Sequence, residues 1–273
     1  MALAARGARV GMMGRDPLKG ERCLEAIRAA TGNASLHLFC ADLASQAEVR
    51  RVAGEILDAF PRIHLLVNNA GVVNLRHSET VDGIEMVFAV NHLASFLLTN
   101  LLLDRLRESA PARIVNVSSH AHKFVKGVDF ADPGRRKNYA AMRVYGQSKL
   151  ANLLFGHELS RRLAGSGVTV NSVHPGAVAT GLGANNGSIS RALIGLLGLF
   201  FNSPARGAAT SLYAATSPDL EGVTGRYFAR CRETSPSAAG RDDAAARRLW
   251  ELSEEMIGLR AAPRPDVPAR NGR

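Results

Sequence analysis

Short, almost uninterrupted apolar runs alternate along the chain with longer stretches in which apolar residues recur every three or four positions. A run without polar alternation is typical of a strand buried on both faces of a sheet, and the longer spacing is typical of an amphipathic helix. The predicted strands are Val10–Met13, Leu36–Cys40, Ile63–Val67, Arg113–Val117, Val168–Val173 and Gly225–Ala229. The predicted helices are Arg15–Ala30, Ser45–Phe60, Gly83–Arg107, Tyr139–Ala164, Asp242–Ile257 and one that Ser203-Pro204 opens.

This order of elements indicates parallel strands joined by helical crossovers. We therefore expect an α/β fold, a doubly wound parallel sheet in a single domain over residues 1–259. The tail at residues 260–273 is rich in Pro, Arg and Ala and is predicted to be disordered.

The first residues allow two interpretations. Met1–Arg15 contains three arginines and no acid, as a mitochondrial transit peptide does. Met1–Arg6 also fits the end of a helix that Gly7 stops, just before the first strand. The second interpretation agrees better with the downstream pattern, and it predicts that the chain starts inside a structural unit.

Composition excludes several classes of protein. Of the 273 residues 46% are hydrophobic and 21% charged, which is typical of a globular chain. No uncharged apolar run reaches the roughly 18 residues of a membrane span. The net charge of +10 is spread along the chain, so we expect a solvated surface and no nucleic-acid partner. Cys23, Cys40 and Cys231 fit no metal or redox spacing and are predicted to be reduced thiols.

Polar residues collect where the predicted strands end. The carboxyl ends of parallel strands meet at one edge of the sheet, and ligands bind beyond that edge. We therefore expect one site there rather than several unrelated loops. The clusters are Asp42, Asn68-Asn69, Ser118-Ser119 and His174-Pro175-Gly176.

The candidate chemistry lies in Tyr145 and Lys149, which are four residues apart and so share one face of a helix. A nearby cation favours the phenolate and lowers the pKa of a tyrosine from its ordinary value near 10. Such a tyrosine exchanges a proton with a carbonyl or alcohol oxygen. Ser119 could hydrogen-bond the same oxygen. Taken alone, the pair also fits a surface tyrosine beside a solvated lysine.

The joint motif set resembles the short-chain dehydrogenase/reductase family, which has a Rossmann-like fold. The resemblance covers about residues 1–259 and rests on Asn68-Asn69-Ala70-Gly71, Asn91, Ser119, Tyr145-x-x-x-Lys149 and Pro175-Gly176. Further segments are similar to the retinol dehydrogenase branch of that family. Among them are Val90-Asn91-His92-Leu93, Ser148-Lys149-Leu150-Ala151-Asn152, Gly225-Arg226-Tyr227-Phe228 and Arg248-Leu249-Trp250.

The resemblance implies a role for each matching residue. Tyr145 would be the general acid/base, Ser119 would polarise the substrate oxygen, and Asn91 would support a proton relay. Lys149 would lower the pKa of Tyr145 and hold the nicotinamide ribose. Other residues would border the cofactor: Asp42 and Leu43 near the adenine, Asn69, Ala70 and Gly71 along the adenosine, and Pro175, Gly176 and Thr180 at the nicotinamide.

The size and charge of the residues at one strand end indicate which nicotinamide cofactor the chain binds. A carboxylate after the second strand of such a fold accepts the ribose hydroxyls of NAD. Here that position holds Gly14, followed by Arg15. A small residue leaves room for a 2′-phosphate and a guanidinium suits its charge, so we expect NADP(H) with Arg15 as a ligand.

One departure from the family pattern matters. The first strand and the Gly-rich loop that cradles the pyrophosphate have no counterpart in the sequence. We expect the neighbouring strands to lack ladder partners as a result. The chain is either a fragment, or the product of a late start codon, or a true short form. A catalytically silent binding or scaffold protein is therefore the alternative to an NADP-dependent oxidoreductase.

The expected substrate is a small apolar carbonyl or alcohol such as retinal or retinol. An apolar segment, Ile189–Phe201, follows Thr180 in the position of the family's substrate lid, and it also fits a buried helix, a homodimer contact or a peripheral contact with a membrane. His120-Ala121-His122 has no third metal ligand nearby and is interpreted as a loop lining the substrate mouth. The expected location is intracellular, on an internal membrane of the endoplasmic reticulum or mitochondrion for a full-length form.

Overall fold

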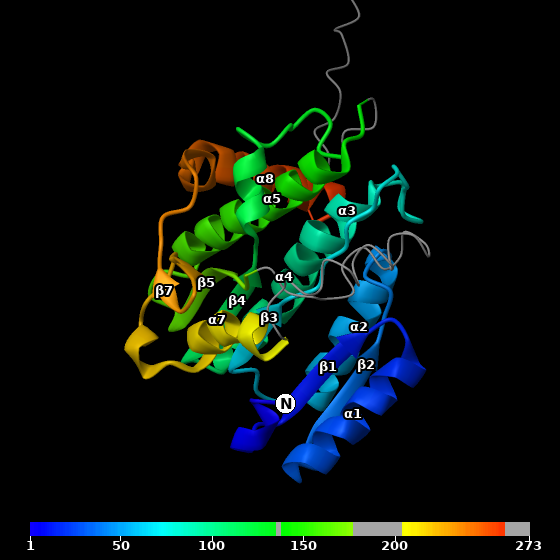
Figure 1. The fold of residues 1–273 in the computed structure, drawn as a ribbon, viewed down its shortest axis with the longest axis vertical. Helices are drawn as coiled ribbons and strands as arrows, with labels where there is room; N and C mark the ends of the chain where they lie inside the picture. The colour runs from blue at the N-terminus through cyan, green and yellow to red at the C-terminus, as the bar shows by residue number, and fades with distance from the viewer. Residues whose placement is uncertain (135–137, 177–203, 260–273) are drawn as a thin grey trace, which may run out of the picture.

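The computed structural model describes residues 1–134, 138–176 and 204–259 (Figure 1). Thr180, the segment Ile189–Phe201 and the tail 260–273 lie outside the described residues. The described strands are β1 (Val10–Gly14), β2 (Leu36–Cys40), β3 (Leu65–Asn68), β4 (Ala112–Val117), β5 (Val168–His174), β6 (Tyr227–Ala229) and β7 (Arg232–Glu233). Strands β1 to β6 match the six predicted ones to within two residues at either end.

The strands form two sheets rather than one. β1 pairs in parallel with β2, and β3, β4, β5 and β6 form a second parallel ladder that ends in the antiparallel β7. Within the described residues no strand joins β1 to β3, which agrees with the expected loss of ladder partners at this point. β1 was expected to be buried, but most of its residues are only half-buried and Gly11 is exposed, because it has a neighbour on one side alone.

Helices cover both faces of the sheets, as a doubly wound fold requires. One face is covered by α1 (Pro17–Thr31) on β1 and β2 and by α7 (Pro204–Thr216) on β3, β4 and β5. On the other face, α2 (Gln46–Ala59) packs on β2 and on α4 (Ala94–Glu108). On the same face, α5 (Ala141–Arg162) packs on β4 and β5 and on α8 (Asp243–Met256). The predicted fold class is confirmed.

Side-chain caps set the helix starts that the sequence predicts. Ser45 accepts a hydrogen bond from the amide of Glu48 at 3.4 Å, and Asp16 accepts one from Lys19 at 3.0 Å. Gly7 ends a short 3₁₀ turn, η1 (Ala4–Arg6), in the left-handed conformation with φ 77°. Met1–Arg6 therefore reads as the end of a helical turn.

The long helix predicted at Gly83–Arg107 is divided into three parts. α3 (Met86–Phe88) leads into a π-helical turn, η2 (Ala89–Leu93), and then into α4. By length and composition Met86–Glu108 is apolar enough to cross a membrane, but 78% of its most apolar window is buried inside the protein, as in a core helix. π-helical turns are rare and often occur at functional sites.

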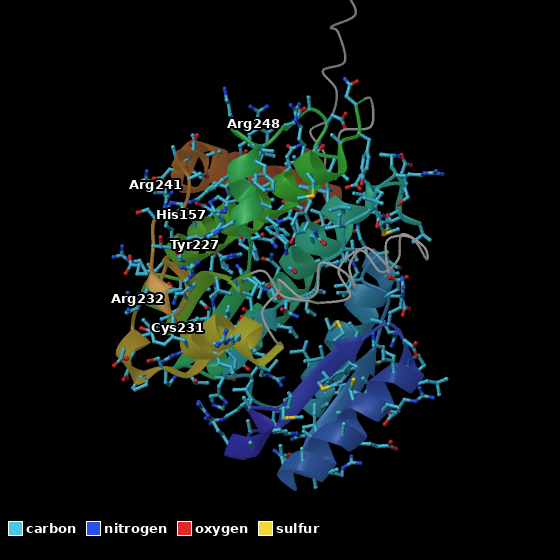
Figure 2. The ribbon with its side chains drawn as sticks, viewed as in Figure 1. His157, Tyr227, Cys231, Arg232, Arg241 and Arg248 are labelled. Carbon is cyan, nitrogen blue, oxygen red and sulfur yellow. The ribbon has the colours of Figure 1, made fainter. Side chains whose placement is uncertain are left out.

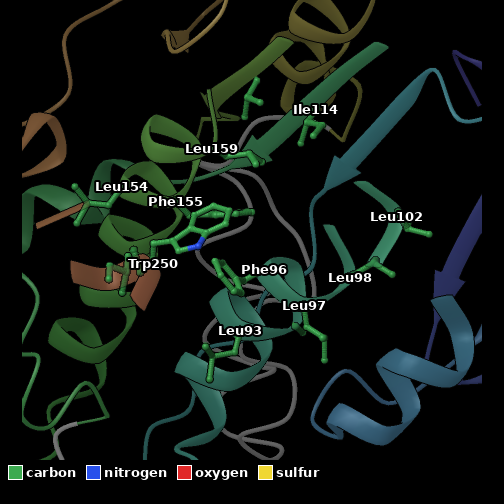
Figure 3. Close-up of a cluster of buried hydrophobic side chains, with 14 of the residues drawn as sticks. Leu93, Phe96, Leu97, Leu98, Leu102, Ile114, Leu154, Phe155, Leu159 and Trp250 are labelled. Atoms are coloured by element: carbon green, nitrogen blue, oxygen red, sulfur yellow. The ribbon is translucent and has the colours of Figure 1, made fainter. Parts of the chain in front are cut away.

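The largest core cluster lies between α4, α5 and α8 (Figure 3). The ring of Phe96 contacts Trp250 at 4.8 Å and Phe155 at 5.2 Å between ring centres. Fully buried leucines such as Leu97 and Leu159 complete this packing. The cluster holds α5 rigidly over the carboxyl edge of β4 and β5.

His92, on the π-helical turn, lies fully buried in this core. Its Nε2 atom hydrogen-bonds Ser253 Oγ at 2.8 Å, and burial lowers its pKa to about 3. On acidification the unfolded chain therefore takes up a proton at this histidine near pH 6.5, whereas the folded chain does not. The contribution of His92 to the stability of the fold is therefore present above pH 6.5 and is lost as the pH falls. Glu85 acts in the opposite direction, because burial raises its pKa to about 7 and the folded chain keeps its proton.

We predict that His92→Gln removes one part of the pH dependence of stability. Between pH 7 and pH 5 the free energy of unfolding of the wild type should fall by about 2 kcal/mol relative to that of the variant. Urea denaturation of both proteins at the two pH values measures this difference. A gap that stays constant, or widens on acidification, contradicts the assignment. If the variant does not fold, the imidazole resonances of the wild type decide, because those of His92 should not shift between pH 7 and pH 5.

Candidate active site

Three of the four predicted polar clusters lie at the carboxyl edge of the second sheet, and the fourth, Asp42, follows β2 in the first sheet. Asn68 ends β3, Ser118 and Ser119 follow β4, and Pro175 and Gly176 follow β5. The N-terminal half of α5 lies across this edge and carries Tyr145 and Lys149. The predicted residues after β3, β4 and β5 thus share one edge with Tyr145 and Lys149, whereas Asp42 and Arg15 follow strands of the first sheet and Thr180 lies outside the described residues.

Tyr145 and Lys149 are buried, and Ser119 beside them is half-buried. Tyr145 is 9% exposed, and the Ser119 side chain lies where its hydroxyl can stabilise the phenolate by a hydrogen bond. Lys149 is 3% exposed, with Nζ 5.7 Å from the centre of the Tyr145 ring. The Nζ atom donates to the carbonyl of Val117 at 3.1 Å, which partly compensates for its removal from water. The tyrosine and the lysine share one side of α5, as their spacing predicts.

The predicted direction of the Tyr145 pKa shift is wrong. Burial raises the pKa of Tyr145, and the hydrogen bond from Ser119 opposes that rise only in part. Burial also lowers the pKa of Lys149 to about 8. The cation lies beside the ring and bonds Val117, so desolvation of the phenolate outweighs its attraction. At neutral pH the site holds a neutral phenol beside an ammonium group.

Asn91 connects α5 to the loop after β3. On η2, its Oδ1 accepts from the amide of Val72 at 2.7 Å, and its Nδ2 donates to the Val72 carbonyl at 3.0 Å and to Ser148 Oγ at 2.9 Å. Ser148 Oγ in turn donates to the carbonyl of Tyr145 at 2.8 Å. Our sequence argument gave Ser148 no role. Its place directly before Lys149 was the available signal.

The loop after β3 approaches this group closely at Gly71. A Cβ atom on Gly71 would lie 3.3 Å from Lys149 Nζ and 3.5 Å from Asn91 Oδ1. A side chain here would therefore press on both polar groups. Asn69 and Ala70, predicted to border the cofactor, belong to the same loop and lie at the surface or half-buried.

A second group of predicted residues lies at the carboxyl ends of β1 and β2. Arg15 is exposed and forms no hydrogen bond or ion pair with the described residues. A Cβ atom on Gly14 would meet nothing within 4 Å, so the space beside it is open. Asp42 Oδ1 accepts from the amide of Ala44 at 3.0 Å and shapes the turn before α2. Leu43, next to it, lines a small pocket with Ala44, Val49, Ile84, Leu93 and Leu97.

Three histidines surround Ser119. His120 and His174 stack with ring centres 3.9 Å apart, and the amide of His120 donates to His174 Nδ1 at 3.4 Å. Burial, together with nearby cationic groups, lowers the pKa of His174 to about 4. In the described part of the chain no group of three or more His, Cys, Asp or Glu residues could hold a metal ion. Burial lowers the pKa of all three histidines, and ring nitrogens of His122 and His174 bond backbone groups.

Three exposed arginines lie apart from one another on the surface (Figure 2). Arg232, Arg241 and Arg248 belong to β7, to the 3₁₀ turn η7 (Ala238–Arg241) and to α8, and they lie at separate exposed places along one side of the molecule (Figure 2). Such a distribution suits a solvated surface. The described cysteines Cys23, Cys40 and Cys231 are free thiols, as predicted.

Comparison with known proteins gives a consistent set of similarities. The family profile described as short chain dehydrogenase matches residues 1–189. Retinol dehydrogenase 12 of Mus musculus is 46% identical over 257 residues, covering 94% of this chain and 81% of the mouse protein. Retinol dehydrogenase 14 of Mus musculus is 44% identical over 266 residues, covering 93% and 79%.

Solved structures agree in fold. An uncharacterized protein from Mycobacterium Paratuberculosis superimposes with a TM-score of 0.72 at 33% identity, over 94% of this chain and 86% of that one. A blue fluorescent protein from a metagenomic library, solved in complex with NADPH, gives a TM-score of 0.60 at 26% identity, over 83% and 87%.

We predict that Tyr145 titrates above its ordinary pKa of about 10 in the cofactor-free chain. Ser119→Ala should move the midpoint further upward, because it removes the hydrogen bond that favours the phenolate. Absorption spectra of tyrosinate, recorded against pH and corrected with Tyr145→Phe, isolate this residue from the other three tyrosines. A midpoint below 10, or one that Ser119→Ala leaves unmoved, contradicts the balance described above.

Proposed function

The chain belongs to the short-chain dehydrogenase/reductase family and is an oxidoreductase of its retinol dehydrogenase-like branch, and from this premise we propose that it interconverts an apolar, retinoid-like aldehyde and its alcohol with NADP(H). The observation that carries the proposal is the grouping of Ser119, Tyr145 and Lys149, in which the Ser119 side chain lowers the pKa of Tyr145 against the rise that burial causes, and Lys149 Nζ lies 5.7 Å from the centre of the Tyr145 ring. These groups lie at the edge of the sheet where such folds bind their ligands.

The residues present fit a nicotinamide cofactor. Because Gly71 has no side chain, the space next to Lys149 Nζ and the Asn91 side chain stays open, and a ribose hydroxyl could bind there. Open space beside Gly14 suits a 2′-phosphate, as does the guanidinium of Arg15, which has no ion-pair partner among the described residues. The cofactor, when bound, supplies or accepts the hydride at the carbonyl carbon.

The protein's own residues would handle the proton. Tyr145, a neutral phenol in this structure, would donate its proton to the carbonyl oxygen during reduction. The Ser119 hydroxyl would donate a hydrogen bond to the same oxygen and stabilise its developing charge. The ammonium of Lys149 would favour the phenolate that remains, and Asn91 would hold α5 and the cofactor loop in register.

An apolar substrate agrees with the surroundings of Tyr145. Its ring packs in a cluster with Val87, Ala121 and Val144, against which Val72 and Val73 also lie. Three large apolar side chains next to the segments of this cluster are exposed: Leu75, Phe124 and Met142. An apolar ligand would cover surface that water now contacts.

The same three positions support a peripheral contact with an internal membrane as part of the proposal. Each exposed apolar residue has an exposed cation beside it in the sequence, in the pairs Leu75-Arg76, Lys123-Phe124 and Met142-Arg143. Apolar side chains combined with cations are typical of surfaces that rest on anionic lipid.

We predict that Tyr145→Phe lowers kcat for retinal reduction by about 10²- to 10⁴-fold, because the proton donor is lost. Binding of NADPH, followed by its fluorescence, should change less than about threefold. Val144→Ile, a change beside the motif that keeps the phenol, serves as the control for packing. Normal turnover by Tyr145→Phe would refute the assignment of the general acid.

The choice of cofactor has its own test. Arg15→Ala should weaken NADPH binding by about tenfold or more, the value of a charge-assisted contact, and leave NADH binding nearly unchanged. Arg22→Ala removes another exposed cation, on α1, and should affect neither cofactor. Equal losses for NADPH and NADH, or none for either, contradict a role for Arg15 in binding the 2′-phosphate.

A further inference from the structure

The backbone carbonyl of Ser119 is held by a histidine that the proposed reaction does not use. His122 lies in the 3₁₀ turn η3 (His120–Phe124), which Ser119 caps, and its side chain is fully buried. The Ser119 carbonyl oxygen accepts from the His122 amide at 3.2 Å and lies 2.5 Å from His122 Nδ1. The last bond of the sheet ladder, from the Ser118 amide to the carbonyl of Val173 at 2.8 Å, comes just before this point.

The other nitrogen of the His122 ring determines which tautomer is present. Nε2 lies 3.1 Å from the amide nitrogen of Ser237 and accepts its hydrogen. An amide N–H is a donor only, so Nε2 carries no proton and Nδ1 must carry the ring hydrogen. His122 Nδ1 therefore donates to the Ser119 carbonyl, and the neutral ring joins the two backbone groups.

The surroundings of His122 keep the ring neutral. Burial lowers its pKa, and the neighbouring Lys123 and His120 act in the same direction. The ring of Tyr227, from β6, packs edge-on against it with ring centres 5.5 Å apart. His174, which stacks on His120, is a further titratable side chain close to this ring. A protonated ring would direct an N–H group at the N–H of Ser237.

The Ser237 end of this bridge is itself anchored. Ser237 caps η7 and its hydroxyl accepts from the amide of Gly240 at 3.3 Å. A Cβ atom on Gly240 would lie 3.2 Å from Leu153 Cδ1, so this turn packs closely on α5. Tyr145 belongs to α5 as well. The His122 ring therefore links the Ser119 backbone, through Ser237 and its turn, to α5, the helix that carries Tyr145.

We propose that His122 is a positioning residue, whose neutral ring fixes the Ser119 backbone so that the serine hydroxyl meets the Tyr145 phenol. This inference rests on the proposed function where it concerns turnover. The geometry of the Ser119–Tyr145 hydrogen bond, however, can be tested without any substrate. Misplacement of a reacting group by about 1 Å can cost roughly 10²-fold in rate.

Two amide substitutions test the hydrogen bonds of the two ring nitrogens separately. The side-chain amide of His122→Asn can reach the position of Nδ1 and keep a donor for the Ser119 carbonyl. The amide of His122→Gln reaches the position of Nε2 instead, where its oxygen can accept from Ser237 but no donor faces Ser119. His64→Asn, at an exposed position before β3, is the matched control. Thermal unfolding identifies any variant that does not fold.

The first readout is the tyrosinate titration of Tyr145 in the cofactor-free chain. His122→Gln should raise the midpoint toward that of Ser119→Ala, while His122→Asn and the control should leave it unchanged. The second readout is turnover, where His122→Gln should lower kcat by about 10- to 100-fold with both KM values within threefold, and His122→Asn should retain at least a third of kcat.

The outcomes distinguish the two proposals. If folded His122→Gln titrates like the wild type, or if both amide variants behave alike, the positioning role is overturned, whatever the turnover. If the wild type reduces no retinal, or Tyr145→Phe remains active, the proposed function fails, and the titration still decides the role of His122.

Discussion

The whole site depends on one buried amide, the side chain of Asn91. Its oxygen and nitrogen satisfy both backbone groups of Val72 and the hydroxyl of Ser148, with no partner from solvent. An unpaired amide in this place would be costly, so the three bonds select a single arrangement of the loop after β3, the π-helical turn and α5. That arrangement brings Gly71 against Lys149 and puts Tyr145 within reach of Ser119.

Burial then determines the protonation states around α5. It favours the neutral form of each group: the pKa of Tyr145 rises, and that of Lys149 falls to about 8. Lys149 remains mostly an ammonium at neutral pH because its pKa of about 8 still lies above 7, and it donates a hydrogen bond to the Val117 carbonyl. A neutral phenol beside a retained cation is the state from which a carbonyl oxygen can be protonated.

The sequence predicts the elements well where the signal is local. The strand Leu36–Cys40 is observed with the same bounds, and the caps at Ser45, Asp16 and Gly7 mark the helix ends that local rules select. The spacing of Tyr145 and Lys149 is equally local, because four residues always make one helical turn. The division between β1 and β3 agrees with the expectation that the strands at this point lack a ladder partner.

The rest depends on contacts between distant segments. The π-helical turn around Asn91 has no sequence signature that we could use, and Ser148 has a role only because Asn91 meets it across 57 residues. The direction of the Tyr145 pKa shift is a balance of burial against the hydrogen bond from Ser119, and judging it needs coordinates. The tautomer of His122 is set by Ser237, 115 residues further along the chain.

The most direct test of the central claim follows the hydrogen atom that the cofactor transfers. NADPH carrying deuterium at C4 of the nicotinamide, on the transferred side, is incubated with the protein and retinal, and the alcohol is analysed by mass spectrometry. The account predicts one deuterium on the carbinol carbon of the product, formed by the wild type and nearly absent with Tyr145→Phe. An alcohol without the label, or the same labelled yield from both proteins, would contradict it.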